Sequence, residues 1–302
     1  MTTRLDRLPS LVRVAARRAR KMAKRLHAGV ALVYLRLRNL VARGAATGSA
    51  PVVVSLTTYG ERIHTVSVAI ESIARGKIRP QRLLLWLQSP EQFEARPQSI
   101  RRLERRGVEV LVSANYGSHT KYYPYVQSVE RHTVPLVTSD DDVVYPPDWL
   151  ARLMSANEQH PEAISAHWIN VMRVSGDRMA DYATWARARD TAVRPANFAV
   201  GVSGVIYPPA MLQELKRRGV GFAAACPNAD DLWLKWVALR AGIPVRQVGS
   251  VPHHFPIIPG SQGQSLMQSN VGENRNDHLI RGLYSAEDLA ALSNSDASHQ
   301  LS

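Results

Sequence analysis

The chain has 302 residues, of which 45% are hydrophobic and 21% are charged, as in an ordinary globular protein. This composition excludes a wholly disordered chain, and the single cysteine, Cys226, excludes an internal disulfide and suits a reducing compartment. No stretch approaches the ~20 apolar residues of a membrane-spanning helix, and arginines interrupt the early apolar positions that a signal peptide would need. The net charge is +13, but residues 1–50 carry twelve Lys and Arg residues against one acid, so the remainder is close to neutral.

The basic N-terminal segment predicts an amphipathic helix over residues 8–41, with a break at Gly29. Apolar side chains recur at helical spacing on one face, and the bases lie largely on the other. A helix of this kind binds anionic membrane surfaces, where each base contributes ~1 kcal/mol. A nucleic-acid-binding tail, a transit peptide and a helix docked on the body are alternatives, and the scarcity of aromatic residues makes nucleic acid the weaker one. With a linker at 44–49, we expect an arm at 1–50 and one domain at 51–302.

Strands and helices alternate through the first half of the body. Short apolar runs predict strands at 52–56, 82–87, 108–112 and 134–138, and helical periodicity predicts helices at 61–74, 98–106, 122–131 and 148–160. The second half is less regular, with strands expected at 199–207 and 244–248, helices at 208–218 and 228–241, and a loop after Pro256 that leads to a short helix at 285–292. This alternation predicts an α/β fold with an open, Rossmann-type mixed sheet flanked by helices.

Polar residues follow two of the predicted strands at their carboxyl ends. One loop contains Thr57, Thr58, Tyr59 and Arg62, and the other contains Asp140, Asp141 and Asp142. Ligands of open α/β sheets bind beyond the carboxyl ends of strands, so we expect one crevice to hold both loops.

Three adjacent carboxylates repel one another unless a cation lies between them. In extended chain alternate side chains share a face, so Asp140 and Asp142 are expected on the same side. Mn²⁺ or Mg²⁺ would relieve their repulsion and leave coordination positions open for phosphate oxygens. The alternative is a solvated acidic turn in which Asp142 serves only as a cap.

A second acidic motif lies at a predicted helix start. Asn228 is expected to be the N-cap, which places Asp230 and Asp231 in the first helical turn. Acids in this position complement the helix dipole, which is the simpler interpretation. The functional interpretation is a general base on a rigid helix, with Asp231 preferred and Asp230 orienting an acceptor hydroxyl.

Weaker candidates complete the set. His253 or His254 could supply an imidazole metal ligand, although a surface histidine pair is more common. Lys121 could neutralise a diphosphate, and Gly204, in the segment 201–204, could let the backbone approach a ligand. Each also has an ordinary interpretation, as a solvated lysine or a turn glycine.

Together these motifs resemble glycosyltransferases of the GT-A type, which carry a DxD motif, and more specifically a bacterial family of the capsule or cell-envelope kind. The motifs are Ser55-Leu56-Thr57-Thr58-Tyr59, Leu85-Trp86-Leu87, Thr120-Lys121-Tyr122, Thr138-Ser139-Asp140-Asp141-Asp142 and Ala229-Asp230-Asp231-Leu232-Trp233. The resemblance implies that Asp140 and Asp142 hold Mn²⁺ or Mg²⁺ on the donor diphosphate and that the loop at Thr57 contacts the nucleotide. It also implies that the pair Asp230-Asp231 contains the base and that a downstream histidine completes the metal shell. Aspartate stands at 230 where this family commonly has glutamate, and the QxxRW motif of processive synthases is absent.

The implied function is the metal-dependent transfer of a sugar from a nucleotide-sugar to a hydroxyl of a glycan or lipid-linked envelope acceptor, with inversion at the anomeric carbon. UDP is the favoured nucleotide, and the expected location is the cytoplasmic face of the plasma membrane, with the arm on the bilayer. Two alternatives use the same residues differently: a metal-dependent nucleotidyl- or phosphoryltransferase, and a non-catalytic interaction protein on a transferase scaffold.

Overall fold

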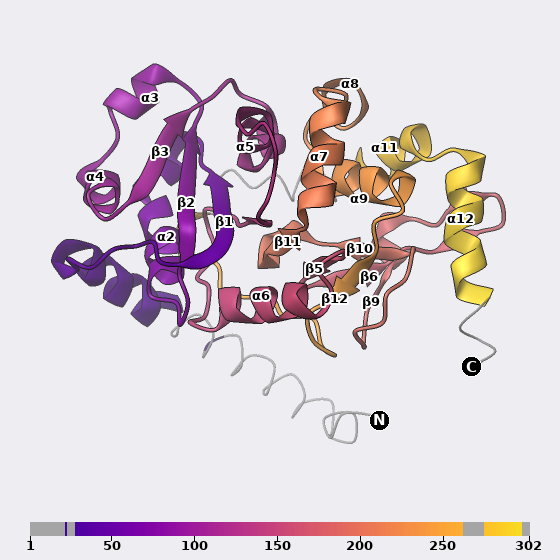
Figure 1. Ribbon diagram of the computed structural model, residues 1–302, viewed down its shortest axis with the longest axis horizontal. Coiled ribbons are helices and arrows are strands. Elements are labelled where there is room, and N and C mark those ends of the chain that lie inside the picture. The colour runs from indigo at the N-terminus through magenta and orange to yellow at the C-terminus, as the bar shows by residue number, and fades with distance from the viewer. Residues whose placement is uncertain (1–21, 23–27, 262–274, 298–302) are drawn as a thin grey trace.

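A seven-stranded sheet forms the centre of the computed structural model, which describes residues 22, 28–261 and 275–297 (Figure 1). The strand order is β12-β5-β11-β4-β1-β2-β3, and every pairing is parallel except those of β11. The strands are β1 (Ala50–Thr57), β2 (Pro80–Leu87), β3 (Val108–Val112), β4 (Leu136–Thr138), β5 (Ile164–Ala166), β11 (Val205–Tyr207) and β12 (Val245–Gln247). The expected α/β class with an open mixed sheet is confirmed.

Helices cover both faces of this sheet, and that is why its strands are nearly continuous apolar runs. One face packs against α2 (Val66–Ala74), α4 (Gln98–Glu104) and α6 (Trp149–Gln159). The other packs against α5 (Tyr123–Ser128), α7 (Pro209–Arg218) and α9 (Asp230–Arg240). In β1, Val53 faces the second group while Val52 and Val54 face the first, as the period of two requires.

Smaller elements surround the central layers. The smaller helices are α3 (Pro90–Glu94), α8 (Phe222–Ala225), α11 (Arg275–Leu283) and α12 (Ala286–Ala297). The 3₁₀ turns are η1 (Gly60–His64), η2 (Gly117–Lys121), η3 (Tyr182–Thr184) and η4 (Gly201–Ser203). One small sheet contains β10 (Asn197–Ala199), β6 (Ile169–Val171) and β9 (Ala186–Arg187), and another contains β7 (Val174–Ser175) and β8 (Arg178–Met179).

Two expectations about the second half are wrong. The strand expected over 199–207 is two strands in different sheets, because η4 interrupts the chain between β10 and β11. The loop expected after Pro256 contains α11, whose polar sequence conceals one apolar face that packs on the core through Ile280. The other predicted strands and helices are present, with ends shifted by a few residues.

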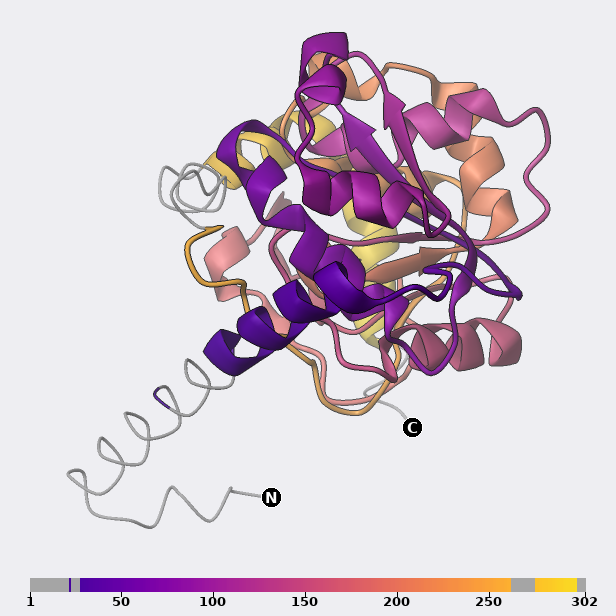
Figure 2. The ribbon, with the colours of Figure 1, turned by 90° about the vertical axis from the view of Figure 1, so that its left-hand side faces the viewer.

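The N-terminal helix spans 28–41 within the described residues and lies across the body (Figure 2). Leu35 is fully buried on this helix, and Asn39 Nδ2 donates to the buried Glu71 carboxylate at 3.1 Å. Arg38 Nε lies 3.1 Å from the same carboxylate, and Arg106 also pairs with it. Gly29, where a break was expected, is helical, and the rest of the predicted arm helix, 8–21 and 23–27, lies outside the described residues.

Gly204 is required by packing at the start of β11. Its φ is +94°, and a Cβ there would lie 2.6 Å from the ring of Trp149. We expect Gly204→Ala to lower the free energy of unfolding by about 2–4 kcal/mol, because steric overlap adds to backbone strain. Gly242→Ala is the matched control, since Gly242 has φ +65° with nothing within 4 Å, and should cost only about 1 kcal/mol. Urea denaturation measures both values, and equal losses would show that Trp149 imposes no constraint.

Candidate active site

The loop after β1 and the acidic turn after β4 are in direct contact. Thr58 Oγ1 donates to Asp141 Oδ2 at 2.6 Å. Arg62 Nη1 donates to Asp141 Oδ1 at 2.8 Å, and its Nη2 lies 3.2 Å from Asp142 Oδ2. The two loops that were predicted to share one crevice therefore meet at the carboxyl edge of the sheet.

The remainder of the β1 loop fixes the direction of Arg62. The guanidinium lies over the Tyr59 ring, 5.1 Å from its centroid, in a cation–π contact. Thr57 turns toward the sheet, and its hydroxyl donates to the Trp86 carbonyl of β2 at 3.1 Å. Thr58 is buried against the acidic turn, whereas Tyr59 is half-buried and lies nearer to solvent.

The acidic turn departs from the extended geometry expected for it. The chain bends at Asp141 and Asp142, so these two residues face Arg62 while Asp140 faces Lys121. Burial raises the pKa of Asp141, and burial together with the charges of Asp140 and Asp141 raises the pKa of Asp142 to about 7. The turn thus holds more negative charge than Arg62 alone neutralises.

Lys121 joins this turn to the second acidic motif. Its Nζ lies 3.2 Å from Asp140 Oδ1 and 2.9 Å from Asp230 Oδ2. Burial alone would lower the pKa of Lys121, but the two carboxylates hold it well above its ordinary value. Burial would likewise raise the pKa of Asp230, and the charge of Lys121 instead holds it below its usual value. Lys121 and Asp230 are therefore both charged at neutral pH.

The turn η2 places Lys121 against the start of α9. His119, within η2, stacks on Phe222 with ring centroids 4.1 Å apart, and its Nε2 lies 2.6 Å from the Cys226 carbonyl oxygen. The backbone N–H of Asp230 donates to Ser118 Oγ at 3.3 Å. These contacts lock η2 to the loop that leads into the second acidic motif.

Asp231 lies beside Asp230 in the first turn of α9 and is held by a backbone donor. The N–H of Gly201 donates to Asp231 Oδ2 at 3.0 Å, and a Cβ at Gly201 would lie 2.7 Å from Asp231 Oδ1. Only glycine allows this approach. Burial and the charge of Asp230 raise the pKa of Asp231 to about 7. Asn228 is not the N-cap, because α9 begins at Asp230 with Ala229 in the cap position.

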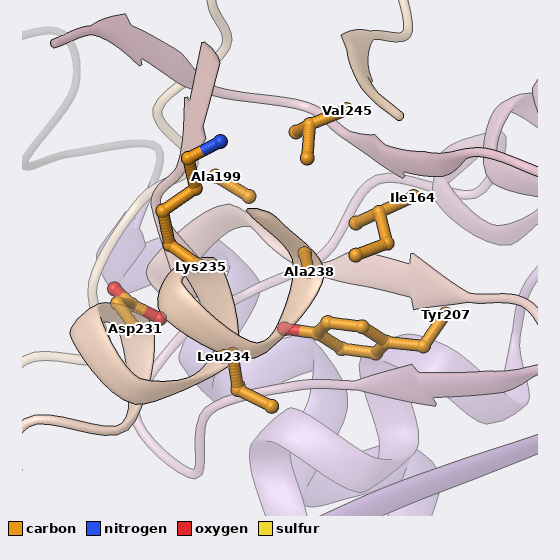
Figure 3. A pocket seen from close by; sticks show the side chains of 8 residues that line it. All are labelled: Ile164, Ala199, Tyr207, Asp231, Leu234, Lys235, Ala238 and Val245. Atoms are coloured by element: carbon orange, nitrogen blue, oxygen red, sulfur yellow. The ribbon is translucent and has the colours of Figure 1, made fainter. Parts of the chain in front are cut away.

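A small cavity lies behind Asp231, between α9 and the sheet (Figure 3). Its volume of ≈ 10 Å³ is roughly room for one water molecule. Tyr207 reaches toward α9 from β11, and the Lys235 side chain turns away from the Asp231 carboxylate (Figure 3). Lys235 Nζ donates to the Pro195 carbonyl, and burial lowers the pKa of Lys235 to about 7. Asp231 itself is half-buried.

The two histidines lie among other partners. His253 Nε2 lies 3.5 Å from Arg152 Nη1, and the His254 ring lies 5.4 Å from the Trp168 ring centroid. Within the described residues, no three Asp, Glu, His or Cys side chains are grouped so as to hold a metal ion. A metal at the acidic turn would therefore need ligands beyond these described residues, such as phosphate oxygens.

Sequence reasoning missed Tyr145, which braces the acidic turn. Its Oη accepts from the Asp140 backbone N–H at 2.8 Å and donates to the Val202 carbonyl at 3.4 Å. It also missed Ser118 and Tyr207, which lie near the aspartates of α9. No motif marks these residues, because their roles arise from tertiary contacts.

No family model and no curated protein matches the chain. Among solved structures, it is similar to a mannosyltransferase from Pyrobaculum calidifontis in complex with GDP-Man and Mn²⁺. The two sequences are 15% identical, the match covers 93% of this chain and 86% of that one, and the TM-score is 0.47. It is also similar to S. aureus TarS 1–349, with 11% identity, coverage of 69% and 60%, and a TM-score of 0.43. A third is CMP:2-keto-3-deoxy-manno-octonic acid synthetase complexed with CTP, with 11% identity, coverage of 66% and 89%, and a TM-score of 0.39. These likenesses are distant, so the function proposed below rests on this chain's own residues.

Proposed function

We propose that this protein is a metal-dependent glycosyltransferase that moves a sugar from a nucleotide-sugar, with UDP favoured, to a hydroxyl of a glycan or lipid-linked envelope acceptor. The observation that carries this proposal is Lys121, which contacts Asp140 on one side and Asp230 on the other. Lys121 thus joins the acidic turn, which could hold a cation against a diphosphate, to the helix start that carries Asp231, a carboxylate with a raised pKa. Displacement at an anomeric carbon needs both, on opposite sides of that carbon: the diphosphate at the bond that breaks and the base at the bond that forms.

The acidic turn suits a divalent cation. Its donors are carboxylate oxygens, which Mg²⁺ and Mn²⁺ prefer, and its negative charge exceeds that of its described cationic partners. In the proposed enzyme Asp140 and Asp142 would hold the ion, which would supply positive charge to neutralise the leaving diphosphate. His253 and His254 are left out of this set because Arg152 and Trp168 are their neighbours.

The chain's own residues supply the remaining steps. Arg62 and Lys121 place positive charge at the diphosphate end of the donor. Asp231 takes the proton of the acceptor hydroxyl as its oxygen bonds to the anomeric carbon. The bond between that carbon and the diphosphate oxygen breaks, and the nucleoside diphosphate leaves. A single displacement of this kind inverts the anomeric configuration.

Calorimetric titration of the full chain with UDP and with GDP, with and without Mn²⁺, tests this function. We expect binding that requires Mn²⁺, and Asp142→Asn should weaken it at least about tenfold. Asp177→Asn is the matched control, because Asp177 is an exposed aspartate outside the site. Binding of neither nucleotide would contradict the proposal and favour a non-catalytic protein on this scaffold.

The pH dependence of transfer follows from the pKa of Asp231. Asp231 must be ionised to accept a proton, and its pKa is raised to about 7. We therefore expect kcat/KM to be low in acid and to rise with pH, reaching half of its plateau near this value. Initial rates between about pH 5 and 9 measure this profile. If kcat/KM is already at its plateau at about pH 5, the base is a carboxylate with an ordinary pKa elsewhere in the protein.

A further inference from the structure

The N-terminal helix (28–41) presents an apolar surface that the body does not cover. Its outward side chains recur at spacings of three and four residues, so they form one line along the helix. We call this line the outer stripe; it comprises Val30, Val33, Tyr34, Leu37, Leu40 and Val41. Val30 is 63% exposed, Leu37 55% and Val41 70%. A row of large exposed apolar side chains on one helix marks an interaction surface.

The opposite face of the same helix is fixed to the body. Leu35 and Ala31 pack in a small core with Val68 and Val144, and Arg38 pairs with Glu71. The helix therefore already packs its other face against the body, and the outer stripe is left for a different partner.

Charge decides which partner fits the outer stripe. Arg36 is exposed on the same helix, beside the stripe rather than within it, and Arg43 is exposed just after the helix ends. Residues 1–27, immediately before the helix, carry nine Lys and Arg residues against Asp6 alone. A second copy of the chain would bring the same positive charge and repel, whereas an anionic bilayer attracts it.

We propose that the outer stripe and its flanking arginines form a docking surface for an anionic lipid bilayer, with the helix lying in the plane of the interface. Val33, Leu37 and Leu40 enter the boundary between headgroups and acyl chains, and the arginines remain at headgroup level. None of the helices in the described part of the chain is long and apolar enough to span a membrane. This proposal does not rest on glycosyl transfer, because vesicle binding alone reports on it.

Docking on this surface would also orient the acidic turn. The helix packs on Ile258, whose backbone N–H donates to the Asp142 carbonyl at 2.7 Å. It also packs on Val144, whose N–H donates to the Pro256 carbonyl at 2.8 Å. The helix and the turn are thus joined by short, hydrogen-bonded connections, so a bilayer that holds the helix also fixes the direction of the site.

Flotation of the full chain with vesicles of phosphatidylglycerol, and with vesicles of phosphatidylcholine alone, tests the surface. We expect binding to the anionic vesicles, and the triple variant Val33→Asn, Leu37→Asn, Leu40→Asn should weaken it at least about tenfold. The matched control is a triple Val→Asn variant at exposed valines elsewhere, namely Val193, Val220 and Val251, which should bind like the wild type. Charge reversal by Arg36→Glu and Arg43→Glu should also reduce binding to phosphatidylglycerol.

Three results would overturn the proposal. Undiminished anionic-vesicle binding by the stripe variant would show that basic residues act without the outer stripe. Equal binding to both vesicle types would remove the role of charge. A wild-type oligomer that the stripe variant dissociates, with vesicle binding unchanged, would assign the stripe to contacts between copies of the chain. Circular dichroism confirms that each variant is folded, as expected for exposed positions.

Discussion

Asp231→Asn should lower the rate of sugar transfer by about 10²–10⁴-fold, the range that a positioned general base contributes. Asparagine keeps the shape of the side chain, and its carbonyl oxygen can still accept the Gly201 N–H that holds Asp231. The amide cannot accept the proton of the acceptor hydroxyl, so the loss should fall on kcat. Binding of the nucleoside diphosphate should change little, because Lys121 and the acidic turn are intact.

The measurement is a steady-state rate with a nucleotide-sugar, beside calorimetry of the free nucleotide. Asp177→Asn makes the same chemical change at an exposed position outside the site and should leave the rate unchanged. A loss of binding as large as the loss of rate would show that Asp231 positions the donor. A rate within a factor of about three of the wild type would exclude it as the base.

Lys121→Met should lower the free energy of unfolding by about 3–5 kcal/mol, which is the usual cost of removing one partner from a buried ion pair. Methionine keeps much of the side-chain volume, so the loss measures charge rather than a cavity. It leaves Asp230 buried without the cation that pairs with it at 2.9 Å, and Asp140 without its partner at 3.2 Å. Nucleotide binding should weaken as well, because the point charge for the diphosphate is gone.

A double variant separates these contributions. Adding Asp230→Asn to Lys121→Met removes the uncompensated charge and should recover part of the stability without restoring nucleotide binding. The loss from Lys121→Met should also shrink in acid, because Lys121 holds the pKa of Asp230 below its ordinary value and protonation there removes the charge. Additive effects of the two substitutions in urea denaturation would contradict a direct pairing.

The main layers of the fold could be predicted because local patterns encode them. The apolar run at 52–56 lies within β1, and β3 matches its predicted bounds. Where the spacing of apolar residues is regular, as in the helix predicted at 208–218, the structure has a helix in the same place. The split of 199–207 could not be predicted, because β10 and β11 are separated by the turn that brings Gly201 to Asp231.

For the site, sequence reasoning found the residue types but not their pairings. Adjacent aspartates are recognisable in a sequence because bringing their charges together costs free energy. Their places at a strand end and at a helix start were predicted. That Lys121 lies between the two motifs depends on η2 packing against Phe222 and Cys226, which no local pattern encodes. The chain turns at Asp141 and Asp142 where extended backbone was assumed, so Asp142 pairs with Arg62 and Asp140 with Lys121. The metal-binding, nucleotide-binding and catalytic roles of these residues stay predictions.

The central claim is that this protein breaks the bond between an anomeric carbon and a nucleoside diphosphate. Incubating the wild-type chain with Mn²⁺ and a panel of UDP- and GDP-sugars in water labelled with heavy oxygen, and resolving the products by phosphorus NMR and mass spectrometry, tests it most directly. We predict slow release of the nucleoside diphosphate, with the label in the freed sugar and none in the phosphates. Release of nucleoside monophosphate or pyrophosphate, or label in a phosphate, would contradict the account and indicate nucleotidyl or phosphoryl transfer.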